Sequence, residues 1–500
     1  MENLQSLFYG FEVVFTTQNL LAAFFGSIIG LFVGAMPGIG SLAGVALLLP
    51  LTFKFNPTTA IILLGALYFS NMYGGAYSAI LINIPGDGPA IMSTLDGYPM
   101  AKKGKAGTAL WTSNLSSFIG GGIGMVIVTF LGPALARIGL NFGPVEMASI
   151  MLVAMTSIGW LMGDDPLKGL ISTCLGMLIA CIGIDSVVGS PRFNFGTIQL
   201  MGGIPFTPLV IGLVGFSRVI SMMQARGEKS PDIIKLKMTE GFPNAHELKL
   251  MFWPSVRAGF VGTFVGVLPG AGATAASFLC YAMQKAFKNE TPMGSGSIEG
   301  LAATESANNA AASGAFAPLL ALGIPGSGTG AVLLGGLMMW GLNPGPLLFQ
   351  TNPDFAWGLI ASLYVSNIVA LVIGFLLIPL LSKAIRVRTG LMIPAITAVC
   401  IIGSYSTTNS MFGVWVMVIS GIIGYIIEKF GYSANPTVLA IVLTNIFEVN
   451  LRRSFIISNG SPLIFFQKPI SAAMMIILFG IVIASIVKPI IDKKRQKAKA

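Results

Sequence analysis

Four short elements of the form Pro-Gly-x-Gly interrupt the apolar stretches of this chain, and they begin at Pro37, Pro85, Pro269 and Pro325. Proline lacks an amide proton and suits the first turn of a helix, while glycine accepts backbone angles that other residues avoid. A helix that restarts inside a membrane exposes unpaired amides and about half a positive charge at its N-terminus. Four such tips, if they converge, would bind an anion without a buried Arg or Lys.

Polar side chains beside these elements would supply the hydrogen bonds that select the anion, and carbonyl groups unwound at the same breaks could hold sodium. We therefore expect substrate to bind at the four elements and at their polar neighbours. The expected substrate-binding residues are Pro37, Gly38, Gly40, Ser41, Asn71, Asn83, Pro85, Gly86, Asp87, Gly88, Pro269, Gly270, Gly272, Thr274, Asn308, Asn309, Pro325, Gly326, Ser327 and Gly328.

Glu305, Asn308 and Asp87 are the candidates for ion coupling. A carboxylate at the centre of a membrane helix costs at least about 2.5 kcal/mol, which favours a function for Glu305 and Asp87. Glu305 could carry a proton or face sodium. Simpler roles stay open, because Glu305 could be a solvated residue at a helix end and Asp87 could only cap a helix. The glycines could also serve helix packing, although proline adds nothing to close helix approach.

The composition places the chain in a bilayer. It has 500 residues, of which 54% are hydrophobic and only 10% are charged, whereas soluble domains carry roughly 25% charged residues. The excess of 29 basic over 19 acidic residues lies in short polar segments, so no nucleic-acid partner is expected. Four cysteines without Cys-x-x-Cys spacing and a single histidine provide no zinc site and no catalytic constellation. The sequence therefore predicts neither a cofactor nor an enzyme.

The two halves of the chain repeat the same motifs. The pattern G-x-F-V-G-x-x-P-G-x-G begins at Gly30 and again at Gly262, an offset of 232. Ile-Pro-Gly-x-Gly begins at Ile84 and again at Ile324, an offset of 240. Two matches in the same order indicate a duplication. Apolar stretches of roughly 20 residues recur along the chain, so we predict an all-α polytopic membrane protein with roughly 10–14 membrane segments, some of them broken or re-entrant.

The polar segments divide this architecture. We expect a first membrane repeat over residues 1–220, a polar central loop over 221–253, a second repeat with additional helices over 254–490, and a basic tail over 491–500. The basic tail and central loop favour the cytoplasmic side, which places the repeats in inverted orientations. Residues 1–53 contain no Lys or Arg, so no cleaved signal peptide is expected.

Several longer motifs lie at and between the breaks. They are Pro37-Gly38-Ile39-Gly40, Met72-Tyr73-Gly74-Gly75, Leu95-Asp96-Gly97-Tyr98-Pro99-Met100, Leu268-Pro269-Gly270-Ala271-Gly272 and Glu305-Ser306-Ala307-Asn308-Asn309. These motifs closely resemble the TctA family, the large membrane subunits of tripartite tricarboxylate transporters, and the resemblance runs over nearly the whole chain. Three residues beside the expected site, Asn71, Asp87 and Thr304, depart from the family's usual pattern, so citrate cannot be assumed as the substrate.

The resemblance implies a multi-pass carrier of the bacterial inner membrane, with its C-terminus in the cytoplasm. Such a carrier receives an organic carboxylate from a periplasmic solute-binding protein, works with a small membrane subunit, and uses an ion gradient, for which sodium is expected. Three other classes remain: an anion channel, an integral membrane enzyme and a structural scaffold. The sequence has no continuous charged stripe and no catalytic cluster, and a scaffold would not explain the duplicated breaks.

Overall fold

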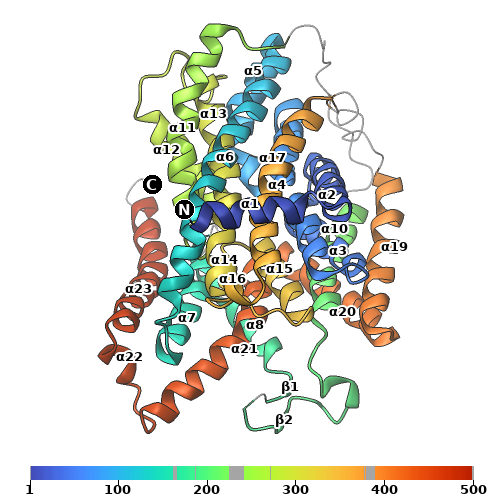
Figure 1. Cartoon of the computed structure of the whole chain (residues 1–500), viewed down its shortest axis with the longest axis vertical. Coiled ribbons are helices and arrows are strands. Elements are labelled where there is room, and N and C mark those ends of the chain that lie inside the picture. Colours follow the sequence, from blue (N-terminus) through green and yellow to red (C-terminus); the bar gives the residue numbers. More distant parts are fainter. Residues whose placement is uncertain are drawn as a thin grey trace.

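The computed structural model describes residues 2–161, 166–185, 187–224, 241–270, 272–376, 378 and 389–497. Parts of the predicted central loop (225–240) and of the predicted basic tail (498–500) lie outside the described residues. The described chain is almost entirely helical, which confirms the all-α prediction (Figure 1). A single pair of two-residue strands is the only sheet in the described part.

The elements of the first half run from the N-terminus to the end of α10. They are α1 (Glu2–Val14), α2 (Thr17–Ala35), α3 (Gly40–Thr52), α4 (Pro57–Ile82), η1 (Gly88–Ala90), α5 (Ile91–Met100), η2 (Ala101–Lys105), α6 (Ala106–Gly139), α7 (Pro144–Leu161), α8 (Pro166–Ala180), β1 (Gly183–Ile184), β2 (Pro191–Arg192), η3 (Ile198–Leu200), α9 (Phe206–Val210), η4 (Ile211–Phe216) and α10 (Ser217–Gln224).

The elements of the second half begin beyond residue 240. They are α11 (Ala245–Val267), α12 (Gly272–Lys285), α13 (Ile298–Gly314), α14 (Phe316–Leu322), α15 (Gly328–Met339), α16 (Leu348–Thr351), α17 (Pro353–Leu376), α19 (Thr389–Thr408), α20 (Met411–Lys429), α21 (Ala434–Ile457), α22 (Ile464–Gln467) and α23 (Pro469–Lys497).

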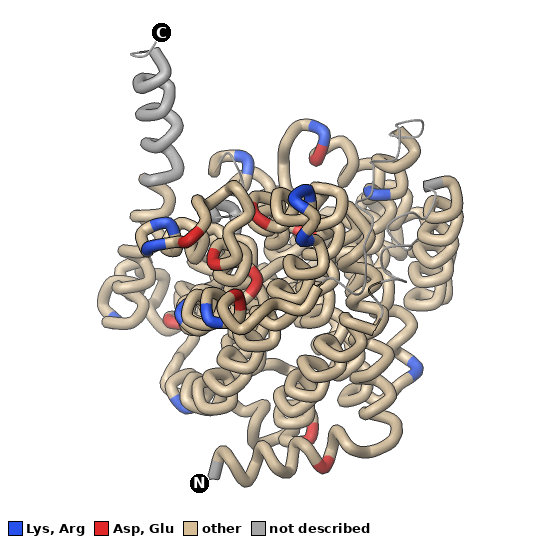
Figure 2. Tube along the Cα trace, turned by 90° about the horizontal axis from the view of Figure 1, so that it is seen from above, with Lys and Arg blue, Asp and Glu red and all other residues tan. Residues whose placement is uncertain are grey.

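Nine helices within the described ranges are long and apolar enough to cross a membrane, and five shorter apolar helices accompany them. These numbers agree with the predicted polytopic architecture. Charged residues occupy only short stretches of the trace (Figure 2). Helix α4 is continuous over Pro57–Ile82, and the break that contains Pro85 follows at residue 83.

Local signals set the ends of the two central helices, α4 and α13. The side chain of Asn56 accepts the amide of Thr59 at the start of α4, where Pro57 occupies the first turn. The Ser297 side chain caps α13 in the same way by accepting the amide of Gly300. Both helices are buried on nearly all sides, which places them at the centre of the bundle.

Each half contains a pair of parallel helices packed backbone to backbone. In the first half, a Cβ atom on Gly26 or Gly30 would lie 2.4 Å from the carbonyl oxygen of Leu63 or Leu67, respectively. Both numbers rise by four, so α2 and α4 run in the same direction. In the second half, Gly262 and Gly266 contact Ala307 and Ala311 in the same manner, so α11 and α13 are also parallel. Glycine permits this close approach.

The two pairs run in opposite directions. Tyr68 of α4 packs against Phe316, with ring centroids 5.8 Å apart, while the Asn308 side chain donates to the carbonyl of Met72 at 3.4 Å. From the first of these contacts to the second, the residue number rises on α4, from 68 to 72, and falls on the α13–α14 segment, from 316 to 308. The helix pairs of the two repeats are therefore antiparallel, as the predicted inverted topology requires.

Candidate functional site

Four breaks in the helices contain the Pro-Gly-x-Gly elements. We name them the first break (36–39), the second (83–87), the third (268–271, of which 271 is outside the described residues) and the fourth (323–327). The first and third lead into α3 and α12, while the second and fourth lead into η1 and α15. Each break therefore ends at the N-terminus of a new helical segment.

The breaks of the two repeats have matching backbone geometry. Gly38 and Gly40 have φ angles of +84° and +67°, and Gly270 and Gly272 have +81° and +61°. Glycine adopts this left-handed region without strain, which explains its presence on both sides of the duplication. At the second break, Asn83 ends α4 in the left-handed region, and Gly323 ends α14 in the same way.

Tertiary contacts repeat with the offsets seen in the sequence. A Cβ atom on Gly86 would lie 1.8 Å from the carbonyl oxygen of Gly34 and 2.9 Å from the Cα atom of Gly75. A Cβ atom on Gly326 would lie 2.8 Å from the carbonyl oxygen of Gly266 and 3.1 Å from the Cβ atom of Ala315. Gly86 and Gly326 are 240 positions apart, their partners Gly34 and Gly266 are 232 apart, and Gly75 and Ala315 are 240 apart. The duplicated motifs therefore build duplicated contacts.

The four breaks meet in a closed cycle, which we call the break ring. The first and second join where the Ser41 amide donates to the carboxylate of Asp87 at 2.9 Å. The second and third meet where a Cβ on Gly88 would lie 2.9 Å from the hydroxyl of Thr274.

The remaining two joints of the break ring involve the fourth break. A Cβ on Gly272 would lie 3.7 Å from the carbonyl oxygen of Gly326 and from the Cβ atom of Ser327. The Ser41 and Thr329 hydroxyls lie 3.0 Å apart and join the fourth break to the first. Helix tips from opposite repeats thus converge on one place.

Asp87 binds two helix starts at once. One carboxylate oxygen accepts the Ser41 amide at the start of α3 and the side-chain amide of Asn71, both at 2.9 Å, and the other accepts the amide of Gly88 at 2.7 Å. Asp87 therefore does cap a helix, as the simpler hypothesis stated, and it also links two breaks. Its counterpart in the second repeat is the uncharged Ser327, which caps α15 through the amide of Gly330.

The asparagines on α4 and α13 contribute buried oxygen atoms. The side-chain oxygens of Asn71, Asn308 and Asn309 are buried without a hydrogen-bond partner. Asn308 donates to the carbonyl of Met72, the neighbour of Asn71, so two of these amides come from adjacent parts of the facing helices. Buried acceptors without partners are costly and are typically found where an ion or water completes the set.

Glu305 lies in the middle of α13 and its side chain is fully buried. The hypothesis of a solvated residue at a helix end is therefore wrong. Its carboxylate accepts the hydroxyls of Ser93, from α5, and Ser117, from α6. These two serines could not be identified from the sequence, because each is more than a hundred residues from Glu305. Its side chain bonds serines of α5 and α6, so among the described residues Glu305 belongs to a polar cluster apart from the joints of the break ring.

The remaining expected residues occupy the break ring or its edge. Pro85 is half-buried within the second break, while Asn83 and Gly38 are exposed. Pro37 belongs to the first break and Pro325 to the fourth. The carbonyl of Pro269 accepts the hydroxyl of Ser157 from α7 at 2.8 Å. Two further residues beside the fourth break were not predicted from the sequence. The hydroxyl of Tyr68 lies 3.3 Å from that of Ser327, and the side chain of Asn435 lies close to Gly328.

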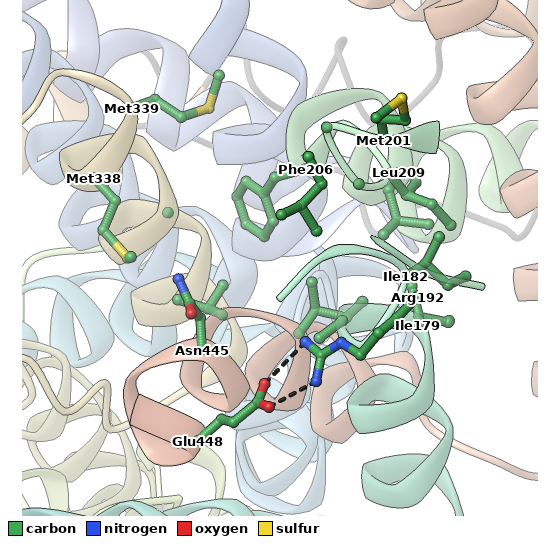
Figure 3. A pocket seen from close by; sticks show the side chains of 18 residues that line it. Ile179, Ile182, Arg192, Met201, Phe206, Leu209, Met338, Met339, Asn445 and Glu448 are labelled. Atoms are coloured by element: carbon green, nitrogen blue, oxygen red, sulfur yellow. Dashed lines mark hydrogen bonds and ion pairs between the residues drawn. The ribbon is translucent and has the colours of Figure 1, made fainter. Parts of the chain in front are cut away.

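A second feature, which the sequence did not indicate, is a cavity of about 530 Å³ near the β1–β2 hairpin. Its walls come from the end of α8, the segment 182–204, α9, the end of α15 and the middle of α21. Figure 3 shows the guanidinium of Arg192 facing the carboxylate of Glu448, with Met338 and Phe206 across the cavity. The hairpin and α5 lie at opposite ends of the molecule in Figure 1.

Four charged side chains fix the hairpin against α21. Arg192 bonds Glu448 through two nitrogens at 2.6 and 3.1 Å, and Arg452 bonds Glu448 at 2.7 Å and Asp185 at 2.5 Å. Asp185 also accepts the backbone amides of the segment that follows it. Those amides, and then the two guanidinium groups, hold the pKa of the Asp185 carboxyl below its ordinary value. The network balances two positive charges with two negative ones.

We expect Asp185→Asn to loosen the hairpin at neutral pH. A lowered pKa means that the ionised form stabilises the fold above the ordinary value near 3.8, and that this stability is lost as the pH falls through the lowered pKa. Hydrogen exchange across residues 183–192 should therefore become several-fold faster in the variant at pH 7, and the two proteins should converge in acid. Glu290→Gln, which removes an exposed partner of His246, is the control. Equal exchange in Asp185→Asn and the unmodified protein at pH 7 would contradict the assignment.

Comparisons with known proteins agree with this architecture. The model of the tripartite tricarboxylate transporter TctA family matches residues 20–439. A protein of Agrobacterium vitis described as "Uncharacterized 52.8 kDa protein in TAR-I ttuC' 3'region" is 35% identical over 499 residues, 99% of each chain. A second, "Uncharacterized protein in TAR-II ttuC' 3'region" from Agrobacterium vitis, is 38% identical over 236 residues, which are 47% of this chain and 98% of that protein. No solved structure matches. Because the family match covers all four breaks and most of the chain, this multi-pass membrane protein belongs to the tripartite tricarboxylate transporter TctA family.

Proposed function

We propose that the chain is a secondary active transporter that imports tricarboxylates or related organic carboxylate anions by alternating access. The break ring is the observation that carries this proposal. Its joints link helix tips from two oppositely directed repeats, as Ser41 with Thr329 and Gly88 with Thr274 illustrate. In carriers built from inverted repeats, one repeat rocks against the other around a site of this kind.

The anion is held at the helix tips of the break ring. Asp87 supports this assignment because a carboxylate already accepts the amides at the starts of α3 and η1. The counterpart of Asp87 in the second repeat, Ser327, carries no charge, so the starts of α12 and α15 have no internal carboxylate from that position. A substrate carboxylate completes the second repeat in the way that Asp87 completes the first.

Uptake is driven by an ion gradient, for which sodium is the proposed ion. The partnerless oxygens of Asn71, Asn308 and Asn309 support this step, because amide carbonyl oxygens are suitable ligands for a hard cation. Glu305 offers a second route, in which its carboxylate takes up a proton on one side of the membrane and releases it on the other. Asp87 is committed to amide donors, so it acts in coupling only through the break ring.

The proposed setting follows from the family. The protein works in the inner membrane of a bacterium with a small membrane subunit, and a periplasmic solute-binding protein delivers the substrate. The C-terminus is proposed to be cytoplasmic because the last ten residues of the sequence are rich in Lys and Arg.

Counterflow in proteoliposomes tests the function. Vesicles that contain the full chain with its small subunit and binding protein are loaded with unlabelled citrate, malate or succinate, and labelled substrate is added outside. A carrier accelerates entry of the label when substrate is present inside, and a sodium gradient increases its accumulation. An anion channel shows no such acceleration, and uptake that requires ATP but ignores ion gradients rejects the proposal.

A further inference from the structure

The cavity beside the hairpin is connected to the break ring by two helices. Gly335 lines the cavity and follows Gly328, at the start of α15, by seven residues, which is about 10 Å along a helix. On α21, Asn435 contacts Gly328, and Ile441 lines the cavity. The cavity volume of about 530 Å³ lies within the range of small-molecule sites, roughly 300–1,000 Å³. None of the expected substrate-binding residues lines it.

Arg192 is the one cation among the described residues that line this cavity, and Glu448 is the one anion. The two parallel bonds between them have the geometry with which arginine recognises a carboxylate. The Nε atom of Arg192 is buried and has no hydrogen-bond partner, so the guanidinium keeps unused donor capacity. Most other lining side chains are apolar, which strengthens any charge interaction inside.

Glu448 retains a partner when Arg192 is taken by another anion. Arg452 bonds the same Glu448 oxygen at 2.7 Å from the neighbouring turn of α21 and does not line the cavity. A carboxylate that enters the cavity can therefore replace Glu448 on Arg192 without leaving Glu448 unpaired. This exchange avoids the large cost of an isolated charge in a poorly solvated place.

We propose that the cavity is an entry subsite for the organic carboxylate, in which Arg192 binds one carboxylate group and Glu448 occupies the same donors when substrate is absent. The subsite rests on the proposed function for its substrate class. The subsite lies at the end of α15, and the start of this helix follows the fourth break. The anion would move from the subsite along α15 to the fourth break.

Opposite effects of two substitutions test the subsite. Arg192→Met removes the anion's partner and should raise the KM for labelled citrate or malate about tenfold, a loss of about 1.4 kcal/mol in binding. Glu448→Gln removes the competing carboxylate and should lower the KM several-fold. Arg218→Met breaks an ion pair with Glu428 that does not line the cavity, so it is the control and should leave the KM unchanged. If Arg192→Met and Glu448→Gln both raise the KM and lower thermal stability together, the network is only structural and the subsite is rejected.

A binding measurement separates the subsite from the transport proposal. Purified full-length protein in detergent is titrated with citrate, malate and succinate, and the shift of its melting temperature is recorded. Gly88→Val, whose added side chain would fill the space beside Thr274 in the break ring, should lose uptake but keep the part of the ligand-induced shift that Arg192 provides. Arg192→Met should lose most of that shift. An unchanged shift in Arg192→Met overturns the subsite even if transport is confirmed, and the absence of carboxylate counterflow overturns the transport proposal even if Arg192 binds these anions.

Discussion

Gly86→Ala is expected to abolish transport. The added methyl group would lie 1.8 Å from the carbonyl oxygen of Gly34, and backbone cannot move aside as the end of a flexible side chain can. Overpacking of a tight core typically costs about 1–3 kcal/mol, and here it separates the second break from α2. We expect uptake to fall at least about tenfold and the melting temperature of the purified protein to fall with it.

The matching position in the second repeat, Gly326, provides a comparison for the size of this effect. Gly326→Ala places its methyl group 2.8 Å from the carbonyl oxygen of Gly266, a milder conflict, so its loss of uptake should be smaller than that of Gly86→Ala. Gly480→Ala is the control, because nothing lies within 4 Å of its added atom on α23. Uptake should remain normal in Gly480→Ala. Normal uptake and melting temperature in Gly86→Ala would show that the second break does not pack as described.

Asp87→Ala is expected to have the second large effect, at least about a tenfold loss of uptake. The substitution releases the Ser41 amide, the Asn71 side chain and the Gly88 amide from one acceptor. Hydrogen bonds to a charged group contribute about 1.5–3 kcal/mol each, and a buried donor left without a partner adds its own cost. The link between the first and second breaks is lost, so the break ring opens.

A double-mutant cycle isolates the contact with Asn71. Asp87→Ala combined with Asn71→Ala removes both partners, so the double variant should be more stable than the sum of the two single losses predicts, by about 0.5–3 kcal/mol. Ser327→Ala, at the counterpart of Asp87, removes one neutral cap and should cost only about 1 kcal/mol. Strict additivity between Asp87→Ala and Asn71→Ala in thermal unfolding would contradict the bond between them.

The repeat and its breaks could be predicted from sequence because both are local. Proline, paired glycines and the offsets of 232 and 240 identify positions where a helix ends and restarts, and the same offsets relate the Gly34–Gly86 contact to the Gly266–Gly326 contact. Their partners in space could not be predicted. Gly38 and Gly86 have identical local motifs, yet a side chain at Gly38 would meet nothing within 4 Å while one at Gly86 would meet backbone.

The role of a glycine inside a helix also depends on tertiary contacts. A Cβ on Gly74 would lie 2.3 Å from the carbonyl oxygen of Leu31, so this glycine serves helix packing inside the continuous helix α4. The Arg192–Glu448 pair joins residues 256 positions apart, and neither residue has a local motif. Only the tertiary structure shows that a short hairpin holds this arginine in a cavity.

The packing of α2 on α4 also has a mechanical consequence. Gly26, Gly30 and Gly34 recur every fourth residue, and each lies directly against main chain of the partner helix. Sliding by a single residue would turn bulky side chains such as Phe25 or Ile29 into a space that has no room for them. The two helices therefore move as one rigid body and cannot slide past each other. Any conformational change of the protein must then take place outside this helix pair, for example at the kink at Gly104 between α5 and α6.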